Sequence, residues 1–213
     1  MLSTSQLESL TALALEYRQA LSAEAFEYLV KERGISRDII GRYGLGTVVG
    51  DHPSHEQYQG WISIPYITAS NTVVGFKFRR IGNADPRFGS PAGQKSHLFN
   101  VRDIQIESDT IVLCEGELDT IIVSGMLEVP AVGCPGVASW KPHYAKLFAG
   151  YDRVIIVGDN DDKENGTNPG QDFSRRVAQE VQNSTIVLLP TGMDISDYYL
   201  TEGADKLRER LGL

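Results

Sequence analysis

Apolar and polar positions follow different patterns in the two halves of the chain. Residues 3–33 and 36–42 repeat apolar side chains at helical spacing, which predicts an opening set of helices. Residues 61–67 and 73–80 alternate apolar with small or polar side chains on either side of a short polar turn. This alternation predicts a β-hairpin, so the first half indicates a small α+β unit.

From residue 110 the pattern changes to apolar, β-branched runs separated by segments with helical spacing. The runs that predict strands are residues 110–114, 129–132, 154–157 and 185–189. The segments that predict helices are residues 118–126, 142–148, 169–181, 195–200 and 204–211. Alternating strands and helices are typical of a parallel sheet covered by helices, so we expect an α/β domain that begins near residues 101–108.

Acidic turns follow three of the predicted strands. Glu115 comes directly after the first strand, and Asp159 and Asp161 come after the third. A further acidic step, Asp194 and Asp197, follows the fourth. Because the carboxyl ends of parallel strands lie at one edge of the sheet, we expect these side chains to converge there.

Carboxylates that fold close together repel one another unless a cation neutralises them. Magnesium prefers one or two carboxylates together with water and phosphate oxygens, and pairs of such ions serve nucleotidyl transfer. Asp159 and Asp161 are spaced to share one ion. Glu115 is a candidate for holding a second ion or for accepting the proton of an attacking hydroxyl.

Each acidic turn also has a purely structural interpretation. Glu115 and Glu117 suit the N-terminus of the following helix, whose dipole favours negative charge. Residues 159–162 suit a polar turn, and Asp194 with Asp197 suits a helix cap and its first-turn acid. The occurrence of acids at three strand ends favours a metal site over three separate structural roles.

The formal net charge of -8 argues against a nucleic-acid partner, but the basic residues are unevenly distributed. Residues 73–102 contain six of the 20 Lys and Arg residues and one of the 28 acids. Lys77 and Arg79 share one face of the predicted strand. Arg87 precedes Phe88, and a cation beside an aromatic ring suits a phosphate and a stacked base. A solvated basic loop explains the charge alone equally well.

Several classes of protein are disfavoured. The two cysteines, Cys114 and Cys134, lack the paired spacing of zinc ligands, and Cys114 suits a buried strand. His52 and His55 lie in a polar loop, where we expect an exposed pair without a function. The chain has neither a run of apolar residues long enough for a membrane span nor a signal-peptide pattern, so we expect a cytoplasmic protein.

The acidic motifs resemble those of the TOPRIM fold. These motifs are Glu-Gly-x-x-Asp at residues 115–119, Asp-x-Asp at residues 159–161, and the step of Asp194 and Asp197. The first half is similar to the catalytic domain of bacterial DnaG-type primases. The stretches that carry this similarity are AFEYLVKERGISRDIIGRYGLGT, WISIPYITASNTVVGFKFRR and DPRFGSPAGQKSHLFNV.

The resemblance implies an α/β fold of TOPRIM type, Rossmann-like, with a mostly parallel sheet flanked by helices and a smaller α+β subdomain before it. The implied domains are residues 1–105 with the basic hairpin, the TOPRIM domain at residues 106–192, and a short helical segment at residues 193–213. Two local departures stand out. Arg87-Phe88 replaces the family's usual Lys-Tyr, and Asp194 and Asp197 are three apart, where cellular members have two acids two apart.

The resemblance also implies residue roles. Glu115 corresponds to the catalytic glutamate, and Asp159 and Asp161 correspond to catalytic metal ligands. Asp194 corresponds to a further metal ligand, and Asp119 to the aspartate that closes the first motif. The residues implied to guide single-stranded template and primer are Lys77, Arg79, Arg87 and Lys95, beside which Phe88 is the candidate stacking ring.

The implied activity is DNA-dependent RNA primer synthesis on single-stranded DNA by two-metal nucleotidyl transfer, with Mg2+, or Mn2+ in its place, and without zinc. The expected partners are the single-stranded DNA template, ribonucleoside triphosphates, a replicative helicase and a separate template-recognition module. We expect a compact, phage- or plasmid-like core without zinc-binding and helicase-binding domains, acting in a bacterial or phage-infected host cytoplasm. Two alternatives stay open: a TOPRIM-type metal-dependent nuclease, and a non-catalytic replisome or single-strand-binding module.

Overall fold

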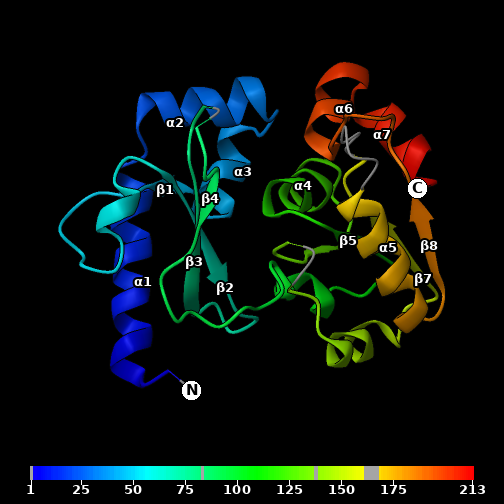
Figure 1. Cartoon of the computed structure of the whole chain (residues 1–213), viewed down its shortest axis with the longest axis horizontal. Coiled ribbons are helices and arrows are strands. Elements are labelled where there is room, and N and C mark those ends of the chain that lie inside the picture. Colours follow the sequence, from blue (N-terminus) through cyan, green and yellow to red (C-terminus); the bar gives the residue numbers. More distant parts are fainter. Residues whose placement is uncertain (1, 83, 137–138, 161–167) are drawn as a thin grey trace. The chain divides into compact units, whose positions relative to one another are not determined.

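The fold is described from a computed structural model (Figure 1), which describes residues 2–82, 84–136, 139–160 and 168–213. The chain forms two compact units, Met1–Lys95 and Ser96–Leu213. The three domains expected from the sequence, with boundaries near residues 105 and 192, stay a prediction. Within the described residues, no helix is both long and apolar enough to cross a membrane.

The first unit is a four-stranded antiparallel sheet with helices. The predicted hairpin forms its two longer strands, and the two short strands beside them were not predicted. Its helices are α1 (Thr4–Gln19), α2 (Ala23–Glu27), the π-helical η1 (Tyr28–Glu32), α3 (Arg37–Arg42) and the 3₁₀ helix η2 (Glu56–Tyr58). Its strands, in sheet order, are β1 (Gly46–Thr47), β2 (Ile62–Ile67), β3 (Val73–Arg79) and β4 (Phe88–Gly89). Ser3 and Ser22 begin α1 and α2 by accepting hydrogen bonds from backbone N–H groups of the first turn.

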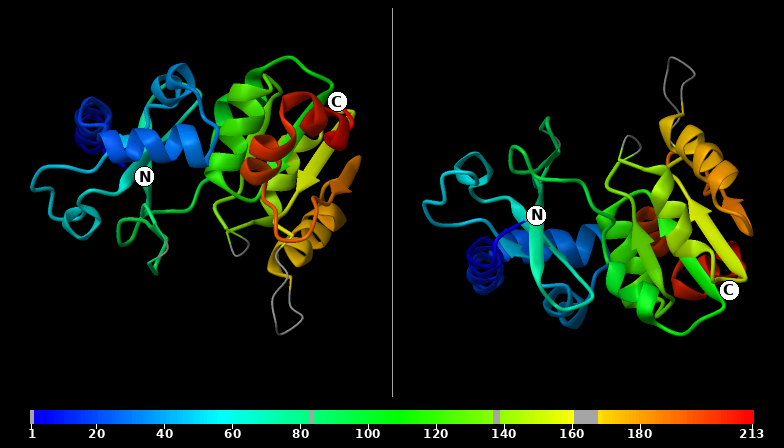
Figure 2. Two further views of the ribbon diagram at one scale, coloured as in Figure 1. Left: turned by 90° about the horizontal axis from the view of Figure 1, so that it is seen from above. Right: turned by 90° about the horizontal axis from the view of Figure 1, so that it is seen from below.

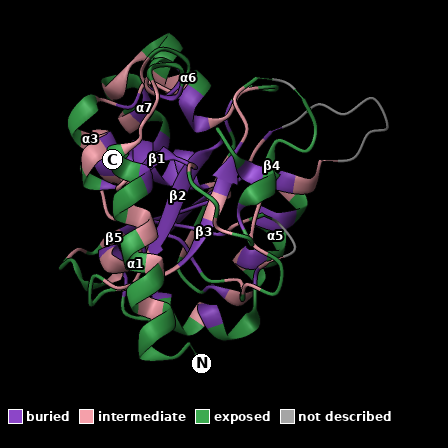
Figure 3. Ribbon diagram, turned by 90° about the vertical axis from the view of Figure 1, so that its left-hand side faces the viewer, coloured by how far each residue is buried: buried purple, intermediate pink, exposed green. Residues whose placement is uncertain are grey.

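The core of the first unit differs from expectation at His55. We expected an exposed loop histidine, but its side chain is buried against the rings of Phe76 and Phe78, 5.4 and 4.9 Å away. The Tyr17 hydroxyl lies 2.8 Å from its Nδ1 atom. Burial, together with the neighbouring His52, lowers the pKa of His55 to about 4. The apolar neighbours come from α1 and β3, so the composition of the loop did not indicate them. In Figure 3, β2 and β3 are mostly buried, whereas α1 shows mainly exposed and intermediate residues to the viewer.

The second unit contains a parallel sheet, as expected, and the structure gives the strand order as β6-β5-β7-β8. Its strands are β5 (Thr110–Cys114), β6 (Ala131–Gly133), β7 (Arg153–Val157) and β8 (Ser184–Val187). Its helices are η3 (Val101–Gln105), α4 (Glu117–Ile121), η4 (Ile122–Met126), η5 (Pro142–Phe148), α5 (Pro169–Glu180), α6 (Ile195–Glu202) and α7 (Ala204–Leu211). The predicted helix at residues 118–126 ends as a π-helix, η4, and that at residues 142–148 is the 3₁₀ helix η5.

Helices lie on both faces of the parallel sheet (Figure 2). One face, with Ile111, Leu113 and Ile156, packs against aromatic side chains of η5 and α5, including Phe148 and Phe173. In Figure 2, α4 and the C-terminal helices lie on the other side of the sheet. Both faces are therefore covered, which explains why the strands are apolar throughout rather than alternating. Cys114 is buried at the end of β5, as predicted.

Candidate active site

The strand order places a topological switch point between β5 and β7. The chain leaves β5 toward β6 on one side and then returns to β7 on the other, so the direction of winding reverses between these strands. Ligands of open α/β sheets bind outside the carboxyl ends of the strands at such a switch point. Glu115 directly follows β5, and Gly158 and Asp159 directly follow β7.

The first two acidic turns meet at this switch point. The backbone N–H of Asp159 donates a hydrogen bond of 2.9 Å to Oε2 of Glu115. Both residues are half-buried. A carboxylate has lone pairs for several partners, so this bond orients Glu115 without preventing it from binding a cation.

The start of α5 packs closely against the turns that carry Glu115 and Asp159. A Cβ atom at Gly170 would lie 2.1 Å from the carbonyl oxygen of Asp159 and 2.7 Å from Oε2 of Glu115. A Cβ atom at Gly158 would lie 2.4 Å from the carbonyl oxygen of Gly170. These positions therefore require glycine, because any side chain would push α5 away from the acidic turns.

The buried thiol of Cys114 lies within the electrostatic reach of two acids. Burial raises its pKa well above the ordinary value, and the carboxylates of Asp119 and Asp159 raise it further. Asp119 is itself buried, in the first helical turn after Glu115. The ends of β5 and β7 therefore share a negative field that attracts cations.

The second thiol, Cys134, gives the same result for the neighbouring strand. Burial raises its pKa to about 12; the guanidinium of Arg176 opposes this shift, and the carboxylates of Glu115 and Glu117 add to it. Negative charge therefore extends along the edge toward the end of β6, with Arg176 as a nearby positive charge.

Asp194 and Asp197 form a helix cap. The Asp194 carboxylate accepts a hydrogen bond of 2.8 Å from the backbone N–H of Asp197, and the Asp197 carboxylate accepts one of 3.4 Å from that of Asp194. This capping box begins α6. Asp194 and Asp197 therefore have the structural role that their spacing suggested. The role of Asp194 as a metal ligand stays a prediction.

Asp161, the remaining predicted ligand, lies outside the described residues. Across residues 2–82, 84–136, 139–160 and 168–213, no three Asp, Glu, His or Cys side chains stand together as ligands of one ion. The structure thus brings Glu115 and the Asp159 turn together, and it does not group Asp194 with them. Carboxylate oxygens such as these fit a hard cation of the Mg2+ type rather than zinc, which favours nitrogen and sulfur ligands.

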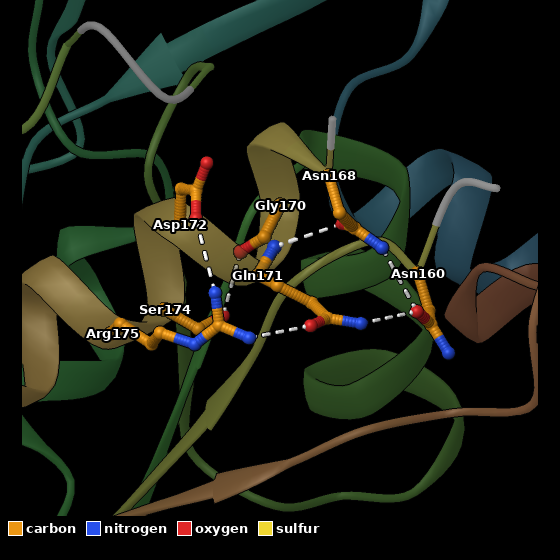
Figure 4. Close-up of polar contacts among 7 residues, drawn as sticks. All are labelled: Asn160, Asn168, Gly170, Gln171, Asp172, Ser174 and Arg175. Atoms are coloured by element: carbon orange, nitrogen blue, oxygen red, sulfur yellow. Dashed lines mark hydrogen bonds and ion pairs between the residues drawn. The ribbon is translucent and has the colours of Figure 1, made fainter. Parts of the chain in front are cut away.

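Asn160 is a residue that sequence reasoning missed. Its side chain is buried, and its Oδ1 atom accepts hydrogen bonds from Nδ2 of Asn168, at 3.0 Å, and Nε2 of Gln171, at 2.7 Å (Figure 4). Its Nδ2 atom donates to the carbonyl oxygen of Leu189 at 2.6 Å. These partners are eight to 29 residues away along the chain, so no local sequence motif indicated that the Asn160 side chain makes these hydrogen bonds.

The candidate nucleic-acid interface lies on β3 and β4 of the first unit. Phe88 pairs with Arg79 in the sheet, and the residue is 44% exposed. The guanidinium of Arg79 lies 4.5 Å from the centre of this ring, and Nζ of Lys77 lies 5.8 Å from it. The structure thus brings Lys77, Arg79 and Phe88 together as a ring flanked by two cations.

Arg79 has a second set of contacts that the sequence did not indicate. Its side chain is buried, and its Nε atom donates a hydrogen bond of 3.1 Å to the hydroxyl of Tyr28. The same hydroxyl accepts a bond of 2.8 Å from Nε of Arg33. Arg79 therefore contacts the Phe88 ring from a buried position, whereas the half-buried Lys77 is more accessible.

Arg87 and Lys95 are exposed on the segment that follows β3. Gln94 anchors this segment, because its amide accepts from the N–H of Phe76 at 2.8 Å and donates to the carbonyl of the same residue at 2.9 Å. The Tyr58 hydroxyl adds a bond of 2.7 Å to the Ser90 carbonyl oxygen. The basic segment is therefore held against the sheet at two points.

The sequence is similar to a phage protein and to bacterial DNA primases. No protein-family model matches the chain. The Gene 57 protein of Mycobacterium phage D29 is 33% identical over 158 residues, which cover 72% of this chain and 99% of that protein. The DNA primase of Rickettsia prowazekii (strain Madrid E) is 28% identical over 197 residues, covering 84% of this chain and 32% of that protein.

The fold has a close match among solved structures. The structure of the DnaG primase catalytic domain bound to ssDNA matches with a TM-score of 0.77 and 18% identity, covering 97% of this chain and 80% of that one. The chain spans about a third of the length of the curated DNA primases it matches, from 32% to 37%. The chain therefore belongs to the same protein family as the Gene 57 protein of Mycobacterium phage D29, and it has the TOPRIM-type fold of the DnaG primase catalytic core.

Proposed function

We propose that this chain is a primase catalytic core that synthesises RNA primers on single-stranded DNA by two-metal nucleotidyl transfer. One observation carries the proposal: the Glu115 carboxylate is held by the Asp159 turn at the switch point of a DnaG-type fold. The DNA primases among the curated relatives support it. The chain would thus be a nucleotidyltransferase of the DNA-directed RNA polymerase type, with a role in DNA replication.

The acids at the carboxyl edge are assigned to catalysis. Glu115, Asp159, Asp161 and Asp194 would hold Mg2+, or Mn2+ in its place. The bound ions would supply the positive charge that stabilises negative charge developing on the α-phosphate and the pyrophosphate. Glu115 is held in place by the Asp159 N–H, so it is ready to act as a ligand or to accept the proton of the attacking 3'-hydroxyl.

The basic residues of the first unit are assigned to the nucleic acid and the incoming nucleotide. Phe88 offers an exposed ring for a base, and the exposed Arg87 and Lys95 with Lys77 offer charge for phosphates. Buried Arg79 strengthens the ring face rather than contacting phosphate. Single-stranded DNA is the ligand of the matching DnaG catalytic domain, which supports this assignment.

The remaining partners follow from the proposed activity. Ribonucleoside triphosphates would be the substrates, and a replicative helicase and a separate template-recognition module would be protein partners. We place this work in the cytoplasm of a bacterium, or of the host cell if a phage encodes the chain. Domain roles follow the same scheme: residues 1–105 for nucleic acid, residues 106–192 for catalysis and residues 193–213 as a helical extension.

A priming assay with a matched pair of variants tests the proposal. The full chain is incubated with circular single-stranded DNA, the four ribonucleoside triphosphates and Mg2+, and labelled oligoribonucleotides are counted. Asp159→Asn should lower primer synthesis by about 100-fold or more, because a metal ligand is lost. Asp152→Asn is the control, since exposed Asp152 precedes β7 at its opposite end and should leave synthesis unchanged.

Three results would count against the proposal. Equal primer synthesis by Asp159→Asn and the unchanged chain would remove the assigned site. Mg2+-dependent loss of the DNA without incorporation of ribonucleotides would favour a nuclease. DNA binding without either reaction, unchanged when the acids are replaced, would favour a non-catalytic module.

A further inference from the structure

Three separate segments meet at the side chain of Asn160. The residue follows Asp159 directly, and its side chain bonds to Asn168 and Gln171 at the start of α5 and to Leu189 after β8. Its own carbonyl oxygen accepts a further bond of 2.8 Å from the backbone N–H of Gly192. Asn160 thus joins the turn after β7 to the helix that follows it and to the loop that leads into Asp194.

An amide is the side chain that satisfies all of these partners. The Leu189 carbonyl can only accept, so it requires an N–H from Asn160. The amide groups of Asn168 and Gln171 present donors, so they require an oxygen. An aspartate in this position would set an oxygen against the Leu189 carbonyl, and an alanine would leave all three groups without this partner.

Asn160 is linked through the main chain to Glu115 and Asp159 on one side and to the loop before Asp194 on the other. The N–H of the preceding residue, Asp159, is the donor that holds Glu115. The Gly192 bond lies two residues before Asp194. Fixing Asn160 therefore fixes the main chain at two of the acidic turns and, through the Asp159 N–H, the carboxylate at the third.

We propose that Asn160 is a positioning residue that locks the three acidic turns together for cation binding. This inference rests on the proposed function, because it concerns the same edge of the sheet. Asn160 binds no ion itself; before an ion arrives, it sets the position of the Glu115 carboxylate and of the main chain that carries Asp159 and leads into Asp194. Supporting groups of this kind change metal affinity by about 10- to 100-fold when they are removed.

Mn2+ binding to the full chain, measured by calorimetry without nucleotide or DNA, tests the inference. Asn160→Ala should raise the dissociation constant of Mn2+ by about tenfold. Asn100→Ala is the matched control, because Asn100 is also a buried asparagine of the second unit and donates to Ser124 and the Ala131 carbonyl. Those partners lie on η4 and at the start of β6, so the control should change the Mn2+ constant by less than about twofold although it also lowers stability.

Two milder variants apply if Asn160→Ala does not fold. Gln171→Met and Asn168→Ser each remove one donor to Asn160 without changing charge, and serine preserves the cap of α5. Each should raise the Mn2+ dissociation constant by about threefold. Hydrogen exchange at the Asp159 amide of the metal-free protein gives a second readout, and it should quicken in these variants more than exchange in the core of β5.

The outcomes separate this inference from the proposed function. Wild-type Mn2+ affinity in Asn160→Ala, or in both milder variants, would overturn the positioning role. An equal loss of affinity in Asn160→Ala and Asn100→Ala would also overturn it, because the cause would be general destabilisation. Weakened Mn2+ binding in Asn160→Ala alone would support it, even if the wild-type chain made no primers and the proposed function failed.

Discussion

The two sheets of this chain present opposite charges by different means. In the antiparallel sheet, Lys77 and Arg79 lie on one strand, β3, beside the ring of Phe88. In the parallel sheet, Glu115 and Asp159 lie in the turns after strands and are held by a backbone hydrogen bond. A polymer of phosphates tolerates cations of variable position, whereas a small cation requires ligands fixed within a fraction of an ångström. The contrast predicts that the acidic edge is sensitive to small backbone shifts and the basic face is not.

Gly170→Ala should have the largest effect on stability and on primer synthesis. A small effect would contradict the predicted sensitivity of the acidic edge to backbone shifts. The new methyl group would meet the Asp159 carbonyl at 2.1 Å, so α5 would have to shift. We expect a loss of about 3 kcal/mol in the free energy of unfolding and a loss of primer synthesis. Urea unfolding and the priming assay measure both.

The control for that prediction is Gly150→Ala, at which a Cβ atom would meet nothing within 4 Å. It should change the free energy of unfolding by less than about 1 kcal/mol. If Gly170→Ala proved as mild as Gly150→Ala, the close approach of α5 to the acids would be wrong.

Acid should weaken the antiparallel sheet through His55, the next largest effect. The pKa of His55 is about 4 in the folded chain, against 6.5 as its ordinary value. Between these values the unfolded chain binds a proton that the folded chain does not, so stability falls as pH drops through this window. We expect a loss of about 2 kcal/mol, with Trp61 fluorescence in a Trp140→Phe background as the readout. A His55→Gln chain with the same pH dependence would refute this assignment.

Phe88→Ala sharpens the comparison on the basic side. Loss of a stacked base should weaken binding of single-stranded DNA about tenfold, while Phe88→Tyr should keep it within about twofold. Leu15→Ala is the control, because Leu15 is likewise exposed on the first unit, at 54%. Fluorescence anisotropy with a labelled oligonucleotide measures these affinities, and equal affinities for Phe88→Ala and Leu15→Ala would exclude the ring from the interface.

The smallest effect concerns salt. Lys77→Gln and Arg87→Gln should each reduce the slope of log affinity against log salt concentration by about 0.7, as expected for one phosphate contact on a single strand. Lys31→Gln should leave the slope unchanged, since Lys31 is exposed and paired with Glu27 at 3.2 Å. Slopes unchanged by all three substitutions would remove phosphate contacts from the basic face.

Local pattern was enough to predict the parallel sheet and the meeting of Glu115 with the Asp159 turn. Buried strands have apolar runs of fixed length, and the acids sit directly after them. The role of Asn160 and the burial of His55 were not predictable. Both depend on partners from segments that are distant in the sequence, and the spacing of apolar residues contains no information about such partners. The helix cap formed by Asp194 and Asp197 was one of two predicted interpretations, the other being a metal site. The spacing of the two residues in the sequence does not distinguish between them.

A crystal of the full chain soaked in Mn2+ tests the central claim most directly. Anomalous scattering should locate an ion bound by carboxylate oxygens of both Glu115 and Asp159, at distances of about 2.0–2.2 Å. The same crystal of Asp159→Asn should show little or no anomalous peak there. A fully occupied ion elsewhere, with Glu115 and Asp159 turned away from each other and nothing bound between them, would contradict the account.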